Sequence, residues 1–252
     1  MKSKNLKLAV VVALFCMCSC NSFANGEKFK SLSGLPSSYD ESVPQKDRFF
    51  FILSRLPEIK RWAVLRSLET EDVQQHSFDT AITAHALVMI QNTYYGGDLS
   101  ADRAAVLALF HDVAEIVTGD CPSPVKHANS QMKESYSQIE GKIADDLLTY
   151  LPKEMQVKYL KILKQQKEEA ELWNIVKAAD VISGIKKCLH EKHLGNTDFD
   201  KALAELTERV MDFDIPAVKY FIQNFLPAFG FECPEDLAPP IVLEPEAEMT
   251  FQ

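Results

Sequence analysis

Residues 101–120, ADRAAVLALFHDVAEIVTGD, carry the strongest indication of fold and chemistry in this chain. Apolar residues recur there at the spacing of a helix face, which predicts an α-helix from about residue 100 to 117. The adjacent pair His111-Asp112 inside this stretch is a poor choice for filling a core, because buried polar groups need partners. Imidazole and carboxylate are good ligands of a divalent metal, provided that further ligands arrive from elsewhere in the chain.

Two other residues supply such ligands. His76 lies upstream in TEDVQQHS, and Asp180 lies downstream in the apolar stretch VKAADVISGIKKCL. A carboxylate buried in such a stretch is expensive unless a cation or hydrogen-bond donors compensate it. Taken alone, His76 could be an ordinary surface histidine. Together the four residues form an H…HD…D pattern that predicts a metal site.

The composition indicates one helical domain. The chain has 252 residues, 46% of them hydrophobic and only nine of them glycine, and no alternating β-branched run stands out. Its formal net charge of −9 argues against a DNA- or RNA-tracking role, although a metal and local basic residues can still attract a small anion. Gly195-Asn196 is expected to close the helix that carries Asp180. Helices are expected near residues 48–57, 73–92, 100–117, 130–150, 153–168, 169–192, 199–212 and 214–226.

The N-terminal segment, residues 1–24, has the features of a signal peptide. A basic start precedes the apolar run LKLAVVVALFCMC, and an A-x-A-like exit follows at Ser22-Phe23-Ala24. The run is shorter than the roughly 20 residues that span a bilayer, so no stable membrane span is expected. MCSC also weakly resembles a lipoprotein cleavage site, with Cys20 as the lipidated residue. The prediction is export to a periplasmic, secreted or lipid-anchored location; the alternative is a cytoplasmic protein with a short apolar extension.

The rest of the chain divides into three parts. Residues 25–47 are rich in Ser, Gly, Pro and charge, which is typical of a flexible linker. Residues 48–231 carry the apolar periodicity of the domain. Residues 232–252 form an acidic, Pro-rich tail. The three cysteines beyond the leader are too scattered for a disulfide framework.

Three stretches closely resemble the HD-domain 5′-deoxynucleotidases of the HD phosphohydrolase superfamily. They are IKRWAVLRSLETEDVQQHS, ALFHDVAEIVTGDCPSPVK and VKAADVISGIKKCLHE, and the resemblance covers roughly Phe50 to Phe231. An HD dipeptide alone is common by chance, whereas HDxxExxTGDxPxPVK with RW upstream is specific. The resemblance implies an all-α, HD-domain helical bundle with a metal site between its helices.

The resemblance also implies the metal ligands and the catalytic residues. His76, His111, Asp112 and Asp180 correspond to the ligands of one divalent ion, for which Co²⁺, Mn²⁺, Fe²⁺ and Zn²⁺ all suit the mixed nitrogen and oxygen donors. Glu115 corresponds to an acidic catalytic residue, expected on the same helix face as His111-Asp112, that holds or deprotonates water. Asp120 corresponds to a second acidic position, which orients the water or protonates the leaving oxygen. The division of roles between these two residues stays open.

The remaining implied residues contact substrate. Arg61 corresponds to a phosphate ligand, and Trp62 to a wall against the sugar that favours 2′-deoxyribose, although tryptophan is more often a core residue. The turn Asp120-Cys121-Pro122-Ser123 corresponds to a substrate-binding loop, in which the family usually has an apolar residue where this chain has Cys121. Lys126 is a further candidate phosphate contact; the alternative is an ordinary solvated lysine.

The implied activity is metal-dependent hydrolysis of 2′-deoxyribonucleoside 5′-monophosphates to deoxynucleoside and phosphate. Two alternatives remain: an HD-fold hydrolase of another nucleotide or phosphoester, and a non-catalytic nucleotide-binding protein. The expected partner is a small deoxynucleoside monophosphate and not a nucleic acid polymer. The resemblance also allows a homodimer, because family members are commonly dimers.

Overall fold

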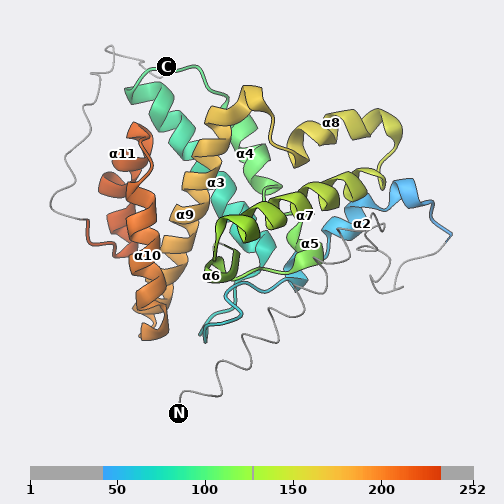
Figure 1. Ribbon diagram of the computed structural model, residues 1–252. Helices are drawn as coiled ribbons and strands as arrows, with labels where there is room; N and C mark the ends of the chain where they lie inside the picture. Colours follow the sequence, from blue (N-terminus) through green and yellow to red (C-terminus); the bar gives the residue numbers. More distant parts are fainter. Residues whose placement is uncertain (1–41, 127, 234–252) are drawn as a thin grey trace, which may run out of the picture.

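Helices account for every regular element of the described residues, apart from an isolated antiparallel bridge between Lys60 and Asp72 (Figure 1). The computed structural model describes residues 42–126 and 128–233. The all-α prediction is therefore confirmed. The predicted signal peptide with Cys20, residues 25–41 of the predicted linker and residues 234–252 of the predicted tail lie outside the described residues.

Two long helices form the centre of the bundle, α3 (Val73–Tyr94) and α9 (Ala170–His193). They pack against each other and against α4 (Ala101–Leu109), while α10 (Asp200–Met211) packs on α9 and α11 (Pro216–Asn224) on α3. In Figure 1, α9 crosses in front of α3 and has α10 beside it. Their apolar faces form one core, which includes the fully buried side chains of Leu87, Leu107, Ile182, Ile185 and Ile222.

A second, smaller core lies beside the first. It joins α2 (Phe49–Leu53), α5 (Glu115–Thr118), α7 (Ser130–Leu148) and the residues around them, with Phe49, Ile143, Leu147 and Leu151 almost completely buried. The helix α8 (Lys153–Leu163) packs on α7. The short helix α6 (Ser123–Lys126) directly precedes α7 in the chain and contacts it. Short 3₁₀ helices connect these elements at Gln45–Asp47, Leu56–Glu58, Lys167–Glu169, Thr197–Phe199 and Leu226–Phe229.

The expected continuous helix over residues 100–117 is wrong. The α-helix ends at Leu109, residues 110–114 form successive turns, and α5 begins at Glu115. The imidazole Nδ1 of His111 lies 2.7 Å from the carbonyl oxygen of Ala108. In a continuing α-helix, this oxygen would accept a hydrogen bond from the backbone N–H of Asp112. The backbone bonds across the break span three residues, such as that from the His111 N–H to Ala108. His111-Asp112 therefore lie in a turn and not on a helix face.

Other predicted elements differ in their ends. The predicted helix 48–57 is two short pieces, α2 and the 3₁₀ turn Leu56–Glu58, because Pro57 interrupts the pattern. The helix α9 ends as expected before Gly195, whose φ of +85° is left-handed.

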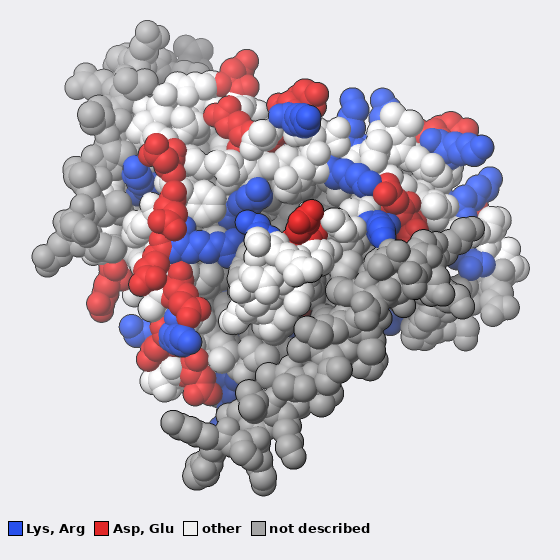
Figure 2. Space-filling view, viewed as in Figure 1, with Lys and Arg blue, Asp and Glu red and all other residues white. Residues whose placement is uncertain are grey.

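The surface reflects the acidic composition. In Figure 2 a band of acidic side chains follows α10, in which Asp200, Glu205 and Glu208 are exposed. Within the part of the chain that the structure describes, no helix combines the length and apolar character needed to cross a bilayer.

Candidate metal centre

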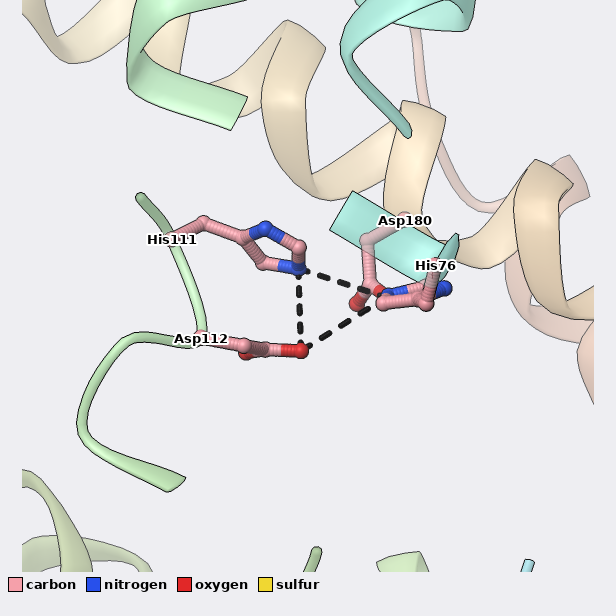
Figure 3. Close-up of side chains that lie close together, drawn as sticks. All are labelled: His76, His111, Asp112 and Asp180. Carbon is pink, nitrogen blue, oxygen red and sulfur yellow. Dashed lines mark ion pairs between the residues drawn. The ribbon is translucent and has the colours of Figure 1, made fainter. Parts of the chain in front are cut away.

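Four side chains from three separate segments point toward one another (Figure 3). His76 comes from the first turn of α3, Asp180 from the middle of α9, and His111-Asp112 from the turn between α4 and α5. One ligand atom of each residue lies within 4.8 Å of the others. The break after Leu109 thus brings two adjacent residues to the gap between the two central helices.

The distances describe a compact cluster of two imidazoles and two carboxylates. Nε2 of His76 lies 3.1 Å from Oδ1 of Asp180 and 3.6 Å from Oδ2 of Asp112. Nε2 of His111 lies 3.1 Å from the same oxygen of Asp112. The ring of His76 is completely buried, whereas the side chains of Asp112 and Asp180 are 17% and 32% exposed, so the cluster is open to solvent on its carboxylate side.

The tautomer of His111 suits a metal ligand. Its Nδ1 lies 2.7 Å from the Ala108 carbonyl oxygen, which can only accept, so Nδ1 carries the hydrogen. In neutral imidazole this leaves a lone pair on Nε2. That atom is buried and lacks a well-oriented hydrogen-bond partner among the described residues. A backbone carbonyl fixing the ring from behind is the usual arrangement of histidine ligands.

The cluster keeps its carboxylates ionised. Burial raises the pKa of Asp180, but the hydrogen bond and charge of His76 outweigh burial and lower the pKa to about 2. Burial lowers the pKa of His111, yet Asp112 and Asp180 raise it to about 9. Two carboxylates with two imidazoles are the donor set of Mn²⁺, Fe²⁺, Co²⁺ or Zn²⁺. The residues present therefore fit a divalent metal ion, whose binding would displace the imidazole proton.

Glu115 opens α5 immediately after the turn that carries His111-Asp112. Its Oε2 is buried and has no hydrogen-bond partner among the described residues. Burial raises the pKa of its carboxyl to about 10, with further contributions from the charges of Asp112 and Asp120. The protein therefore places a proton-bearing carboxyl beside the cluster, although not on a helix shared with His111 as expected.

Arg61 and Trp62 lie in the segment before α3, close to Asp112 and Asp120. Nη1 of Arg61 lies 3.5 Å from Oδ2 of Asp112. Trp62 has a left-handed φ of +62°, which is strained for a bulky residue. Its backbone N–H donates to Oδ2 of Asp120 at 2.9 Å. Asp120 is thus brought to the Arg61-Trp62 segment, where it stabilises an unusual backbone conformation.

The rest of the predicted substrate loop follows Asp120. Cys121 and Pro122 are half-buried, and Ser123 is exposed at the start of α6. Nζ of Lys126 pairs with Glu140 at 2.8 Å, while its charge also faces Asp112 and Glu115. The roles of Cys121, Pro122, Ser123 and Lys126 stay predictions.

The structure adds Glu71 to the site, a residue that the sequence alone did not single out. Oε2 of Glu71 accepts hydrogen bonds from Nε of Arg61 at 3.0 Å and from Nε1 of Trp62 at 2.8 Å. A lone Glu in TEDVQQHS gives no sequence signal of this role, because it lies ten and nine residues after its partners Arg61 and Trp62.

A second missed group holds the same loop from α9. The fully buried carboxylate of Glu191 accepts from the backbone N–H groups of Leu68 and Glu69 at 2.9 and 3.1 Å. It also accepts from Nδ2 of Asn196 at 2.7 Å and pairs with Nζ of Lys187 at 2.5 Å. These bonds tie the loop between Arg61 and α3 to the helix that carries Asp180.

Known proteins resemble the chain over this whole region. A family model described as 5′-deoxynucleotidase YfbR-like matches residues 48–229. A 5′-deoxynucleotidase of Vibrio vulnificus is 38% identical over 191 residues, which are 76% of this chain and 98% of that protein. A 5′-deoxynucleotidase of Pasteurella multocida is 39% identical over 182 residues, 72% of this chain and 93% of that protein.

Solved structures share the fold at lower identity. An HD-domain phosphohydrolase from Listeria innocua gives a TM-score of 0.65 at 24% identity, over 72% of this chain and 88% of that one. A cyanophage S-2L HD phosphohydrolase, bound to dA and one catalytic Zn²⁺ ion, gives 0.51 at 18% identity, over 71% of this chain and 95% of that one. These likenesses confirm the HD-domain fold expected from the sequence.

Proposed function

This chain belongs to the YfbR-like 5′-deoxynucleotidase family, and on that premise we propose that it hydrolyses 2′-deoxyribonucleoside 5′-monophosphates to deoxynucleoside and inorganic phosphate. The observation that carries this proposal is the convergence of His76, His111, Asp112 and Asp180 within 4.8 Å. The 5′-deoxynucleotidase activity for which the two bacterial relatives are named, together with the Zn²⁺ and dA of the cyanophage protein, supports the substrate class and the metal.

The four converging residues would hold the metal ion. When bound, a divalent ion supplies Lewis acidity and lowers the pKa of water. The nearby Nη1 of Arg61, 3.5 Å from Asp112, directs positive charge to the place where a phosphate would meet the cluster. Trp62 forms the wall beside it, where a ribose 2′-hydroxyl would clash or lose hydrogen bonds.

Hydrolysis adds a water oxygen to phosphorus and breaks the bond between phosphorus and O5′. One proton leaves the attacking water and one must reach the departing O5′. Glu115 is the group placed to hold or move a proton, because its carboxyl faces Asp112 and its Oε2 is otherwise unpartnered among the described residues. Asp120 accepts the backbone hydrogen bond from Trp62 at 2.9 Å, and its charge also acts on Glu115, so it stays a second candidate for orienting the water or protonating O5′.

A panel of phosphate esters tests the proposal. Purified protein is incubated with dAMP, AMP, dATP and p-nitrophenyl phosphate, with and without a chelator, and inorganic phosphate is measured. The expected result is release from dAMP well above AMP, abolished by chelator and restored by Co²⁺, Mn²⁺ or Zn²⁺. Hydrolysis of dATP alone, or activity indifferent to chelator, contradicts the proposal.

We also propose a homodimer formed through the outer face of α3. Phe78, Ile82 and Met89 lie on one side of this helix and are 62%, 54% and 49% exposed. The opposite side of α3 is packed into the core, so the helix is apolar on two sides. Contiguous exposed apolar residues of this kind support an interface.

The predicted export signal in residues 1–24 is also part of the proposal. N-terminal sequencing of the protein from its native cells tests it. A mature chain that begins near residue 25, or at a lipidated Cys20, supports export, whereas an intact Met1 in the cytosolic fraction contradicts it.

A further inference from the structure

One carboxylate oxygen holds both residues that are expected to face the substrate. Oε2 of Glu71 accepts from Nε of Arg61 and from Nε1 of Trp62. Neighbouring side chains in an extended segment normally point to opposite faces. The left-handed φ of Trp62 removes this alternation, and the guanidinium carbon of Arg61 lies 5.9 Å from the centre of the Trp62 ring. A single acceptor therefore fixes the cation and the aromatic ring relative to each other.

Attraction for phosphate does not explain an acidic residue in this place. A carboxylate 3.0 Å from Arg61 offsets part of the positive charge that an anion would meet. Glu71 occupies the Nε edge of the guanidinium, however, and leaves Nη1 directed at Asp112. The indole has only one N–H, so its bond to Glu71 also selects the rotation of the ring. Orientation is the effect that this carboxylate supplies.

The backbone around Glu71 makes it a firm support. Its carbonyl accepts from the Arg61 N–H at 2.9 Å, and the next residue, Asp72, is the N-cap of α3. The Asp72 side chain accepts a hydrogen bond from the Gln75 N–H, and the Gln75 side chain accepts one from the Asp72 N–H. The two bonds form a capping box. His76 follows in the same helical turn. Glu71 is thus tied to the helix that supplies one of the four metal-site residues, and its side chain is only 15% exposed.

We infer that Glu71 is the positioning residue that sets the preference for deoxyribose over ribose, an inference that rests on the proposed function. By holding the indole edge, Glu71 keeps Trp62 at the distance from the sugar at which a 2′-hydroxyl is rejected. By holding Nε of Arg61, it keeps the phosphate of the substrate in register with that wall. Without Glu71 both side chains gain rotational freedom, so discrimination falls more than the rate with the deoxy substrate.

Three substitutions at this position separate orientation from charge. Glu71→Gln keeps an oxygen that can accept both hydrogen bonds but removes the charge. Glu71→Asp keeps the charge but is one methylene too short to reach both donors, and Glu71→Ala removes both. The matched control is Glu169→Ala, which removes another partly buried Arg–Glu pair, formed at 2.6 Å with Arg103 in the first turn of α4.

The measured quantity is the ratio of kcat/KM for dAMP to kcat/KM for AMP. We expect Glu71→Ala and Glu71→Asp to lower this ratio about tenfold, the effect of roughly one lost charged hydrogen bond. Glu71→Gln should restore most of it, and Glu169→Ala should not change it. The chain has only two tryptophans, so the emission spectrum offers a second readout in which Trp173 is a constant background. The emission of Trp62 should shift in the Ala and Asp variants and not in the Gln variant.

The outcomes distinguish this inference from the proposed function. An active wild-type protein whose Ala and Asp variants keep the full ratio overturns the role of Glu71 and leaves the function standing. Equal losses for dAMP and AMP, with no rescue by Gln, indicate a merely structural residue and also overturn it. A wild-type protein that hydrolyses neither compound overturns the function itself, and with it the substrate role of Glu71.

Discussion

The turn at His111-Asp112 supplies two of the four side chains of the cluster, and the Ala108 carbonyl orients one of them, His111. Removal of one carboxylate from the cluster leaves the two imidazoles with a single acidic partner. We expect Asp112→Ala to lose bound metal and nearly all phosphate release from dAMP, because loss of one of four ligands weakens a divalent site by orders of magnitude. Metal content by mass spectrometry and phosphate release measure the two effects.

The control for that variant is Glu154→Ala, which removes an exposed carboxylate from the start of α8. It should keep both metal and activity. An Asp112→Ala protein that retains a full equivalent of metal refutes the assignment of Asp112 as a ligand.

Glu115 supports a separate residue-scale prediction. Glu115→Gln removes the titrating proton but keeps the shape of the side chain. We expect it to lower kcat for dAMP by about 10²–10⁴, the usual contribution of general acid–base catalysis, while metal content stays unchanged. Retained turnover with intact metal would show that another group moves the proton.

The ends of the helices differ in how far the sequence predicts them. The start of α3 at Val73 and the end of α9 before Gly195 follow from local signals, a capping residue and a left-handed glycine, so they are visible in the sequence. The break after Leu109 is not, because apolar periodicity continues through it. A side chain, His111, takes over a backbone acceptor there.

The same distinction applies to the site. His76, His111, Asp112 and Asp180 are recognisable because their residue types suit one ion and their motifs resemble a family. Glu71 and Glu191 are not recognisable, since the hydrogen bonds of Glu71 reach back nine and ten residues and the loop that Glu191 holds is 122 and 123 residues away. Long-range hydrogen bonds leave no periodic pattern in the sequence.

The attachment of that loop to α9 gives a prediction about pH. Burial raises the pKa of Glu191, but hydrogen bonds from Lys187, Asn196 and two backbone N–H groups lower it to about 2, from an ordinary value of 4.5. The folded state therefore binds this proton more weakly than the unfolded state. Its stabilisation is fully present above about pH 4.5 and is lost as the pH falls toward 2.

Urea unfolding of the metal-free protein at pH 7 and pH 3 measures this contribution. At pH 7, Glu191→Ala should lower the free energy of unfolding by about 3–5 kcal/mol, because it leaves the charge of Lys187 buried without its partner. The difference between wild type and variant should shrink at pH 3. A difference independent of pH would mean that ionisation of Glu191 is not what holds the loop.

The helix α3 has one apolar side in the core and a second apolar side on the surface of the molecule. A single chain leaves Phe78, Ile82 and Met89 facing solvent, and pairing with a second copy would remove them from water. A charge in the middle of this row opposes such pairing, because it would be buried without a partner. We expect wild-type protein to elute with twice the mass of one chain in size-exclusion chromatography with light scattering, and Ile82→Glu to elute as a monomer.

Val157→Glu is the matched control, since Val157 is 63% exposed on α8 and lies off this face, so it should stay dimeric. A monomeric wild type, or an Ile82→Glu protein that remains dimeric, places any self-association elsewhere than on α3.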